Sequence, residues 1–401
     1  MKEKEAILKR QKFNTRFKNE DMDFLFNYML GYSSLSGLSH GEMFAIAAQI
    51  KDGDAGSWRQ AFGSHADWLE QDLKAESAPS QSKQASRHFS IFHALRAKLQ
   101  LTDPTEPGFE VSITRMESHF QDACSKSGYP LEAVEIPFEH ASLSGYLLRA
   151  DGTKHPTLII IGGGDTYRED LFYFGGLAGY RRGYNVLMID LPGQGKLPLR
   201  KLTFRHDTEK PVSAVVDWLD TRHLVTPGKL GIFGLSGGGY FTARAVSLDK
   251  RFAAWVASTP ITNMSLVFER EMPASLVASP GWLQRLLIRV AGTVNEAAQV
   301  NIKKYFWQAG ITSYDEAMEK IVRHCIVDVE KITCKCLFLM GANEAGELIR
   351  QTDELYERVK ADPQNKLRLF RPEEAGDAHC QVNNLPLAQV EIFDWLDAML
   401  V

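Results

Sequence analysis

The chain has 401 residues, of which 44% are apolar and 24% charged, and its formal net charge is −4. This globular composition excludes extensive disorder, and 46 basic against 50 acidic residues disfavour a nucleic-acid partner. No apolar run approaches the roughly 20 residues of a membrane span, and residues 1–20 lack a signal-peptide pattern. The five cysteines fit no zinc spacing, so we expect free thiols, a cytoplasmic location and no metal or cofactor.

The first third of the chain is predicted to be helical. Apolar residues recur at helical spacing from about residue 25, and Ser39 with Glu42 three residues later predicts a capping box. A polar loop is expected over 75–85, and two further helices over about 89–101 and 110–126. We therefore assign residues 1–129 to a helical N-terminal region.

From about residue 130 the pattern changes to short apolar runs separated by helical stretches. A hairpin is predicted over 134–138 and 143–148, and further strands over 157–161, 185–189, 229–233, 252–257, 336–340 and 366–370. Continuous apolar strands that alternate with helices predict an α/β fold, with a mostly parallel sheet covered on both faces. A helical insertion over 262–332 interrupts this alternation, so the sheet domain is expected to comprise 130–261 and 333–401.

A serine lies in a Gly-x-Ser-x-Gly motif between a predicted strand and a predicted helix. In Gly-Leu-Ser-Gly-Gly, Ser236 would sit on a sharp turn as a nucleophile, and the N–H of Gly237 would face a developing oxyanion. A second match places Ser39 after a helical segment, where an N-cap role explains it better. The strand-to-helix context therefore selects Ser236.

A serine nucleophile needs a base, and in this motif the base comes late in the chain. Only His324 and His379 follow Ser236. His324 lies in the helical insertion, which favours an ordinary structural histidine. His379 lies in the loop after the last predicted strand, at the carboxyl end of the sheet, where a catalytic base is expected.

The acid that orients this base is expected after the strand at 336–340. Glu344 and Glu347 both follow that strand. Glu344 is preferred because it lies nearer the strand end in a turn bounded by glycines, whereas Glu347 fits the first turn of a helix. Asp377 is disfavoured, because a residue two positions from His379 rarely reaches the required ring nitrogen.

A run of three glycines follows the strand at 157–161. Such a loop brings backbone N–H groups close to a substrate, so Gly163 or Gly164 is predicted to give the second oxyanion donor. Asp165 comes next, either as the cap of a following helix or as a carboxyl group at the site. The glycine-containing loop at 190–195 is expected to be structural only.

The strand order, the Ser236 motif, the glycine loop and the late histidine together resemble the α/β-hydrolases. Segments 161–170, 341–344 and 379–384 are similar to a branch that includes dihydroxypseudooxynicotine hydrolase and fungal polyketide-shortening hydrolases of pigment synthesis. This resemblance implies a helical N-terminal lid and cleavage of a carbon–carbon bond next to a ketone. It also implies roles for four residues: Ser236 as nucleophile, Glu344 as acid, His379 as base, and Asp165 in place of an active-site glutamate.

These observations predict a serine hydrolase that acts on a small β-diketone or polyketide-like molecule. Ester, thioester or peptide hydrolysis, or acyl transfer or cyclisation, would use the same residues, and a non-catalytic binding protein is the alternative of another class. Residues 1–126 and 262–332 are expected to cover the Ser236 pocket with aromatic side chains such as Phe24, Trp58 or Trp282. A homodimer is also expected.

Overall fold

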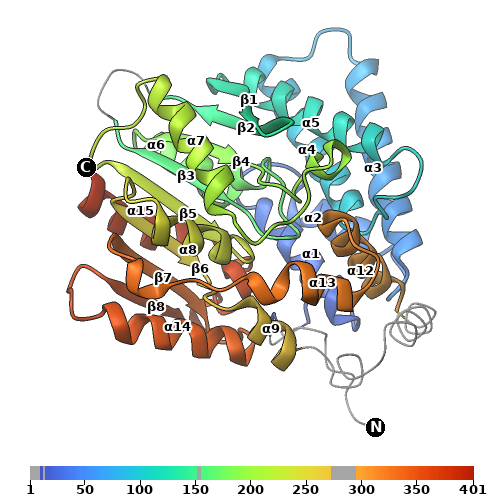
Figure 1. Ribbon diagram of the computed structural model, residues 1–401. Helices are drawn as coiled ribbons and strands as arrows, with labels where there is room; N and C mark the ends of the chain where they lie inside the picture. The colour runs from blue at the N-terminus through green and yellow to red at the C-terminus, as the bar shows by residue number, and fades with distance from the viewer. Residues whose placement is uncertain (1–9, 12–13, 151–154, 272–294) are drawn as a thin grey trace. The chain divides into compact units, whose positions relative to one another are not determined.

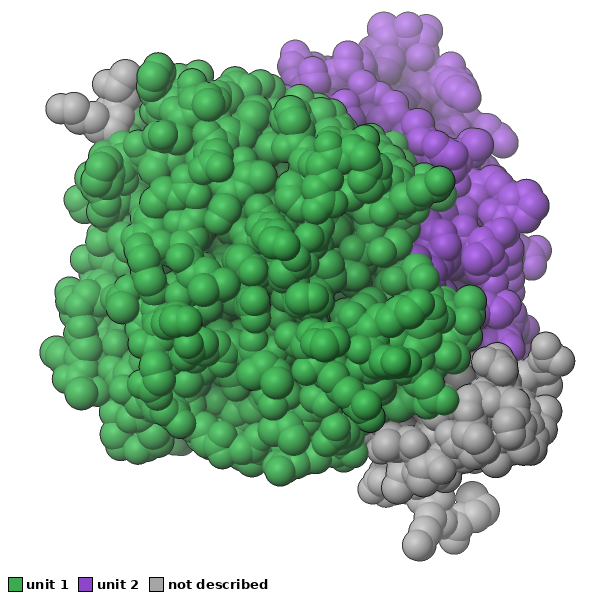
Figure 2. All heavy atoms as spheres, in the orientation of Figure 1, with its two compact units in different colours: residues 1–12, 132–281, 308–401 green, residues 13–131, 282–307 purple. Residues whose placement is uncertain are grey.

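A computed structural model describes residues 10–11, 14–150, 155–271 and 295–401. Its internal contacts divide the chain into two compact units, coloured green and purple in Figure 2. The sheet unit comprises 1–12, 132–281 and 308–401, and the helical unit comprises 13–131 and 282–307.

The sheet unit is built on eight strands in the order β1-β2-β4-β3-β5-β6-β7-β8 (Figure 1). Strand β2 runs antiparallel to β4, and the neighbours from β4 through β8 pair in parallel. The strands are β1 (Leu131–Phe138), β2 (Ala141–Leu148), β3 (Thr157–Ile161), β4 (Asn185–Ile189), β5 (Leu230–Leu235), β6 (Ala254–Ser258), β7 (Lys335–Gly341) and β8 (Lys366–Phe370). Each parallel strand begins and ends within two residues of its predicted bounds.

Helices cover both faces of this sheet, as the doubly apolar strands require. Ile159 and Ile161 of β3 belong to the core beneath one set of helices. On the opposite face, Ile160 and Met188 lie against the glycines of the turn at 172–176 that leads into α6. The first face has α7 (Glu209–Thr221), α8 (Gly238–Leu248) and α14 (Gly346–Val359), and the second has α6 (Leu177–Arg181) and α15 (Leu385–Leu400). The predicted α/β-hydrolase fold class is therefore confirmed.

The helical unit contains the N-terminal helices. They are α1 (Glu20–Tyr32), α2 (His40–Ala47), α3 (Ala55–Ala75), α4 (Gln81–Gln100) and α5 (Phe109–Lys126). Ser39 and Glu42 form the predicted capping box at α2. The predicted end of the loop over 75–85 is wrong. The Ser80 side chain accepts a hydrogen bond from the N–H of Lys83, so α4 begins within that polar stretch.

The segment predicted as a continuous helical insertion divides between the two units. Its described helices are α9 (Met264–Glu271), α12 (Glu296–Ala309) and α13 (Tyr314–Lys320). The insertion is not helical to its predicted end, because α13 ends at Lys320 and a bridge between Asn263 and Ile326 follows. Trp282 lies outside the described residues, and Trp58 packs against Phe62 within the helical unit. The lid and the domain bounds stay predictions.

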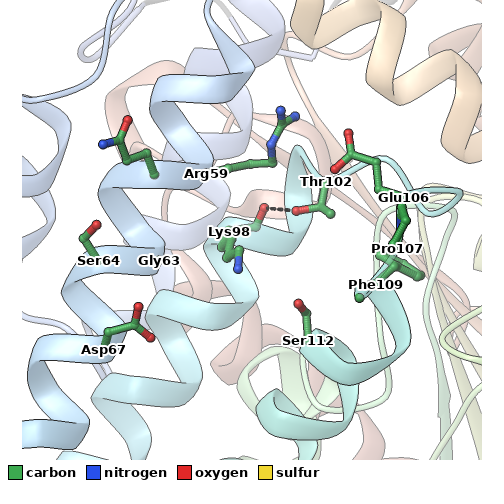
Figure 3. A pocket seen from close by; sticks show the side chains of 12 residues that line it. Arg59, Gly63, Ser64, Asp67, Lys98, Thr102, Glu106, Pro107, Phe109 and Ser112 are labelled. Carbon is green, nitrogen blue, oxygen red and sulfur yellow. Dashed lines mark hydrogen bonds between the residues drawn. The ribbon is translucent and has the colours of Figure 1, made fainter.

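A polar cavity of about 420 Å³ lies within the helical unit (Figure 3). Its walls include Arg59 of α3 and Lys98 of α4, and Thr102 donates a hydrogen bond to the Lys98 carbonyl at 2.9 Å. None of the residues predicted for catalysis lines it. In the part of the chain that the structure describes, no helix is long and apolar enough to cross a membrane.

Candidate active site

Ser236 occupies the turn between β5 and α8, at the carboxyl end of the sheet. Its φ of 56° lies in the left-handed region that residues other than glycine rarely adopt, so the surrounding contacts must hold it there. Its N–H donates to the Ser258 carbonyl on β6 at 2.6 Å, and its own carbonyl accepts from Gly239 at 2.7 Å. A Cβ on Gly238 would lie 2.5 Å from the Ile161 carbonyl, so only glycine lets α8 start this close to β3.

The structure brings Ser236 together with the predicted base and the predicted acid. The Ser236 hydroxyl lies 2.9 Å from Nε2 of His379, and Nδ1 of His379 lies 2.8 Å from Oε2 of Glu344. His379 and Glu344 are both buried. The two ring nitrogens thus face different partners, which is the arrangement that a hydroxyl, a general base and an orienting carboxylate need.

Burial and neighbouring charges act in opposite directions on the imidazole. Burial lowers the pKa of His379, but the Cys380 sulfur and the Glu344 carboxylate raise it by more. The pKa of His379 therefore lies well above the ordinary value of a histidine. Proton uptake from Ser236 is favoured by such a base, once the solution is alkaline enough to leave the imidazole neutral.

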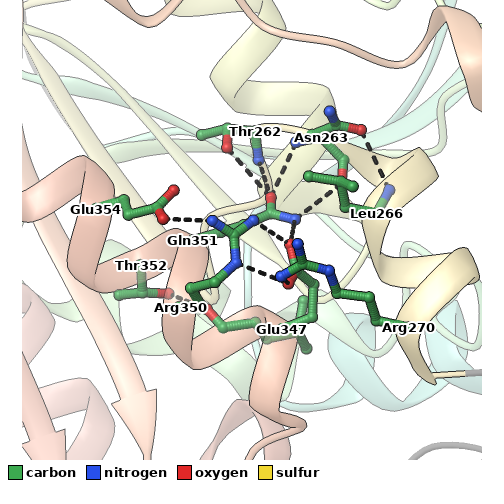
Figure 4. A network of polar contacts seen from close by, with 10 residues as sticks. Thr262, Asn263, Leu266, Arg270, Glu347, Arg350, Gln351, Thr352 and Glu354 are labelled. Carbon is green, nitrogen blue, oxygen red and sulfur yellow. Dashed lines mark hydrogen bonds and ion pairs between the residues drawn. The ribbon is translucent and has the colours of Figure 1, made fainter.

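Glu347, the alternative acid, pairs with two arginines and not with His379. It lies in the first turn of α14, where Arg350 at 2.5 Å and Arg270 of α9 at 2.8 Å pair with its carboxylate (Figure 4). Arg350 lowers the pKa of Glu347. Gln351 extends this network to the backbone N–H groups of Thr262 and Asn263 at 2.8 and 2.9 Å. Glu347 thus fastens α14 to α9, and Glu344 is the glutamate beside His379.

Asp377, the alternative acid, and His324, the alternative base, contact other residues. Asp377 accepts hydrogen bonds from the side chains of Asn343 and Asn383, as expected of a residue that orders its own loop. The ring of His324 lies 5.3 Å from that of His206.

The glycine loop after β3 packs directly on the Ser236 turn. A Cβ on Gly163 would lie 2.6 Å from the Ser236 Cβ and 2.8 Å from the backbone nitrogen of Gly237. Gly237 precedes α8, so its N–H belongs to the unpaired group at a helix start. The two predicted sources of oxyanion donors therefore meet beside the Ser236 hydroxyl.

A buried glutamine that the sequence analysis left without a role holds the glycine loop in place. Nε2 of Gln194 donates to the carbonyls of Gly162 at 2.6 Å and Gly163 at 2.8 Å, and its Oε1 accepts from Leu191 at 2.7 Å. Gln308 donates to the Gly164 carbonyl at 2.8 Å. A glutamine between two glycines, after the strand next to the glycine loop, was the signal available in the sequence.

Asp165 follows the glycine loop and contacts the N-terminal segment of the chain. The N–H of Tyr167 donates to Asp170, and the next regular turn begins at Phe172. The Asp165 carboxylate pairs with the Arg10 guanidinium at 3.4 Å, and both side chains are largely buried. The Arg10 carbonyl accepts from the N–H of His379 at 2.8 Å, so this residue contacts both the glycine loop and the base loop.

The fold and the family match define the class of protein. The family model described as "Prolyl oligopeptidase family" matches residues 177–284, which include the Ser236 turn. The chain has the α/β-hydrolase fold, its Ser236 turn is similar to this family, and it is a hydrolase.

Relatives that match over nearly the whole chain include fungal hydrolases. The hydrolase LUC6 of Fusarium sp is 28% identical, over 95% of this chain and 97% of its own. The 20-hydroxy-prefusarin hydrolase FUS2 of Gibberella moniliformis is 26% identical over the same shares. The crystal structure of 2,6-dihydroxy-pseudo-oxynicotine hydrolase matches with a TM-score of 0.68, at 20% identity, over 92% of this chain and 95% of that one.

Proposed function

We propose that this protein is a serine hydrolase in which Ser236 is the nucleophile, His379 the general base and Glu344 the orienting acid. The observation that supports this most directly is the pair of hydrogen-bond contacts, 2.9 and 2.8 Å long, that links these side chains. The hydroxyl of Ser236 attacks a carbonyl carbon as His379 takes its proton. The N–H of Gly237, with that of Gly163 or Gly164, stabilises the oxyanion.

We further propose that the bond cleaved is a carbon–carbon bond next to a ketone, in a small polyketide-like molecule. Collapse of the tetrahedral adduct breaks that bond, and its electron pair leaves as an enolate, which the neighbouring carbonyl stabilises. His379 returns the proton to this carbon, and a water molecule that it deprotonates then releases the acyl group from Ser236. One carboxylic acid and one ketone result. The fungal relatives and the resemblance of the motifs support this choice.

Hydrolysis of an ester, thioester or peptide on the same side chains is the second candidate, as is acyl transfer to another nucleophile. The match to the prolyl oligopeptidase family supports this candidate, because it includes the Ser236 turn. A β-diketone and an ester that share one acyl group separate the two candidates by their relative kcat/KM. Preference for the diketone supports carbon–carbon hydrolysis, and preference for the ester contradicts it.

Asp165 is assigned a positioning role through Arg10. Arg10 pairs with the Asp165 carboxylate at 3.4 Å, and its carbonyl accepts from the N–H of His379, so this pair can hold the glycine loop and the base loop together. The test is Asp165→Asn on the same two substrates. A loss confined to the diketone would restore a proton-donor role, and an equal loss on both supports positioning.

The nucleophile is tested by labelling with a fluorophosphonate probe. The wild type should be labelled, and Ser236→Ala should lose both the label and the activity. Ser39→Ala is the matched control, because Ser39 lies in the second Gly-x-Ser-x-Gly sequence but caps a helix. Labelling that survives in Ser236→Ala would contradict the proposal.

A further inference from the structure

Ser258, the last residue of β6, and Thr259, which follows it, contact the nucleophile, the acid and the residue after the base of the proposed triad. The Ser258 carbonyl accepts from the N–H of Ser236 at 2.6 Å, and also from the thiol of Cys380, the residue after the base, at 3.2 Å. The hydroxyl of Thr259 donates to Oε1 of Glu344 at 2.8 Å. Ser258 and Thr259 are both fully buried.

The contact with Thr259 gives the second oxygen of the Glu344 carboxylate a hydrogen-bond partner. One oxygen of the carboxylate faces Nδ1 of His379, and the other accepts from Thr259. A carboxylate offers only acceptors, so the threonine hydroxyl is the donor. With both oxygens bonded, rotation of the carboxylate would break two buried hydrogen bonds, and its plane is therefore fixed relative to the imidazole.

Thr259 is itself held in place relative to the nucleophile. Its carbonyl oxygen lies only 1.9 Å from where a Cβ on Gly239 would be, so the backbone of Thr259 packs directly on the first turn of α8. A branched side chain at this position has few rotamers. The hydroxyl is thus presented to Glu344 from backbone that packs against the first turn of α8, directly after Ser236.

We propose that Thr259 is a positioning residue, whose hydroxyl holds Glu344 in the orientation that keeps Nδ1 of His379 protonated and Nε2 directed at Ser236. This inference rests on the proposed function of these three residues. It adds a fourth side chain to the three of the triad, from the residue directly after β6, the strand that neighbours β5 in the sheet.

The test compares Thr259→Val, which removes the hydroxyl at nearly constant volume, with Thr259→Ser, which keeps it. Hydrolysis of p-nitrophenyl acetate by the full chain gives kcat and KM, and a fluorophosphonate gives the labelling rate. We expect kcat of the Val variant to fall about tenfold to a hundredfold, the cost of a lost hydrogen bond to a charged group, with KM within about threefold. The Ser variant should stay within about threefold of the wild type.

The pH profile gives a readout that a general loss of structure would not move. Without Thr259 as a donor, the charge of Glu344 acts on His379 alone, so the acid limb of kcat/KM should shift to higher pH in the Val variant and not in the Ser variant. Thr352→Val is the matched control, because the buried Thr352 hydroxyl donates to a carbonyl of its own helix. Its kcat should be unchanged.

The outcomes separate this inference from the proposed function. If Ser236→Ala keeps the label and the activity, the proposed function fails. If Ser236→Ala loses both but Thr259→Val keeps wild-type kcat and an unmoved acid limb, only the role of Thr259 is overturned. If the Val variant does not fold, Thr259→Ala is assayed instead. In a Glu344→Gln background, loss of the Thr259 hydroxyl should have little further effect, and a full additive loss would also overturn the role.

Discussion

Replacement of Gln194 by methionine tests whether the glycine loop is held by its buried amide. The change keeps the length and approximate volume of the side chain and removes three hydrogen bonds, to the carbonyls of Gly162 and Gly163 and from the N–H of Leu191. Because Gln194 is 1% exposed, water has little access to the groups left behind. The variant should therefore fold less stably and present the loop less accurately to the substrate.

The expected magnitude follows from the number of groups left unpaired. Each buried polar group without a partner costs about 1 to 3 kcal/mol, so three cost about 3 to 9 kcal/mol before the loop relaxes. Relaxation favours the low end, and we expect the free energy of unfolding to fall by about 3 kcal/mol. Loss of accurate oxyanion donors should lower kcat of the folded fraction by at least about tenfold.

Urea denaturation measures the first quantity, and ester hydrolysis corrected for the folded fraction measures the second. Asn185→Leu is the matched control, since Asn185 is a buried amide bonded to Ala150 and Thr157 at the opposite, amino end of β4. That variant should lose stability and keep its kcat within about twofold. Wild-type kcat in folded Gln194→Met, or an equal kcat loss in the control, would refute the reasoning.

Three further results are expected. Burial lowers the pKa of His379, but the Cys380 and Glu344 groups raise that pKa by more. The acid limb of kcat/KM should therefore lie above pH about 6.5, and a pH–rate profile with its acid limb at or below that value would contradict this. Gly163→Ala should lower the fluorophosphonate labelling rate at least about a hundredfold, because its Cβ would lie 2.6 Å from that of Ser236; an unchanged rate would count against the crowded turn. Burial lowers the pKa of His93 to about 3, so the unfolded chain takes up a proton between pH 7 and 5 that the folded one excludes. Stability should fall by about 2 kcal/mol over that interval, and a urea titration of His93→Gln should show that dependence removed; equal slopes in both proteins would exclude it.

Features that depend on neighbouring residues could be predicted from the sequence. The capping box at Ser39 and Glu42 needs only residues three apart, and the continuous apolar strands specify a sheet buried on both faces. The choice of Glu344 over Glu347 also has a local cause. The first glutamate lies in the turn after β7, and the second lies within α14, where Arg350 is one turn away.

Features that depend on contacts across the sheet unit could not be read in the same way. Thr259 reaches Glu344 across 85 positions of the chain, and Arg10 reaches Asp165 across 155. Neither residue type nor spacing marks such pairs, because a threonine after a strand and an arginine near a terminus are common. For Thr259 and Glu344 the strand order brings the pair together, since β6 and β7 are neighbours whose carboxyl ends lie side by side.

The crowding around Ser236 has a consequence for attempts to engineer this enzyme. At Gly163, Gly238 and Gly239 an added methyl group would meet main-chain atoms, which cannot rotate aside as a side chain can. Saturation libraries at these three positions would therefore yield mostly inactive clones. Libraries should instead vary positions whose side chains face open space and keep the three glycines unchanged.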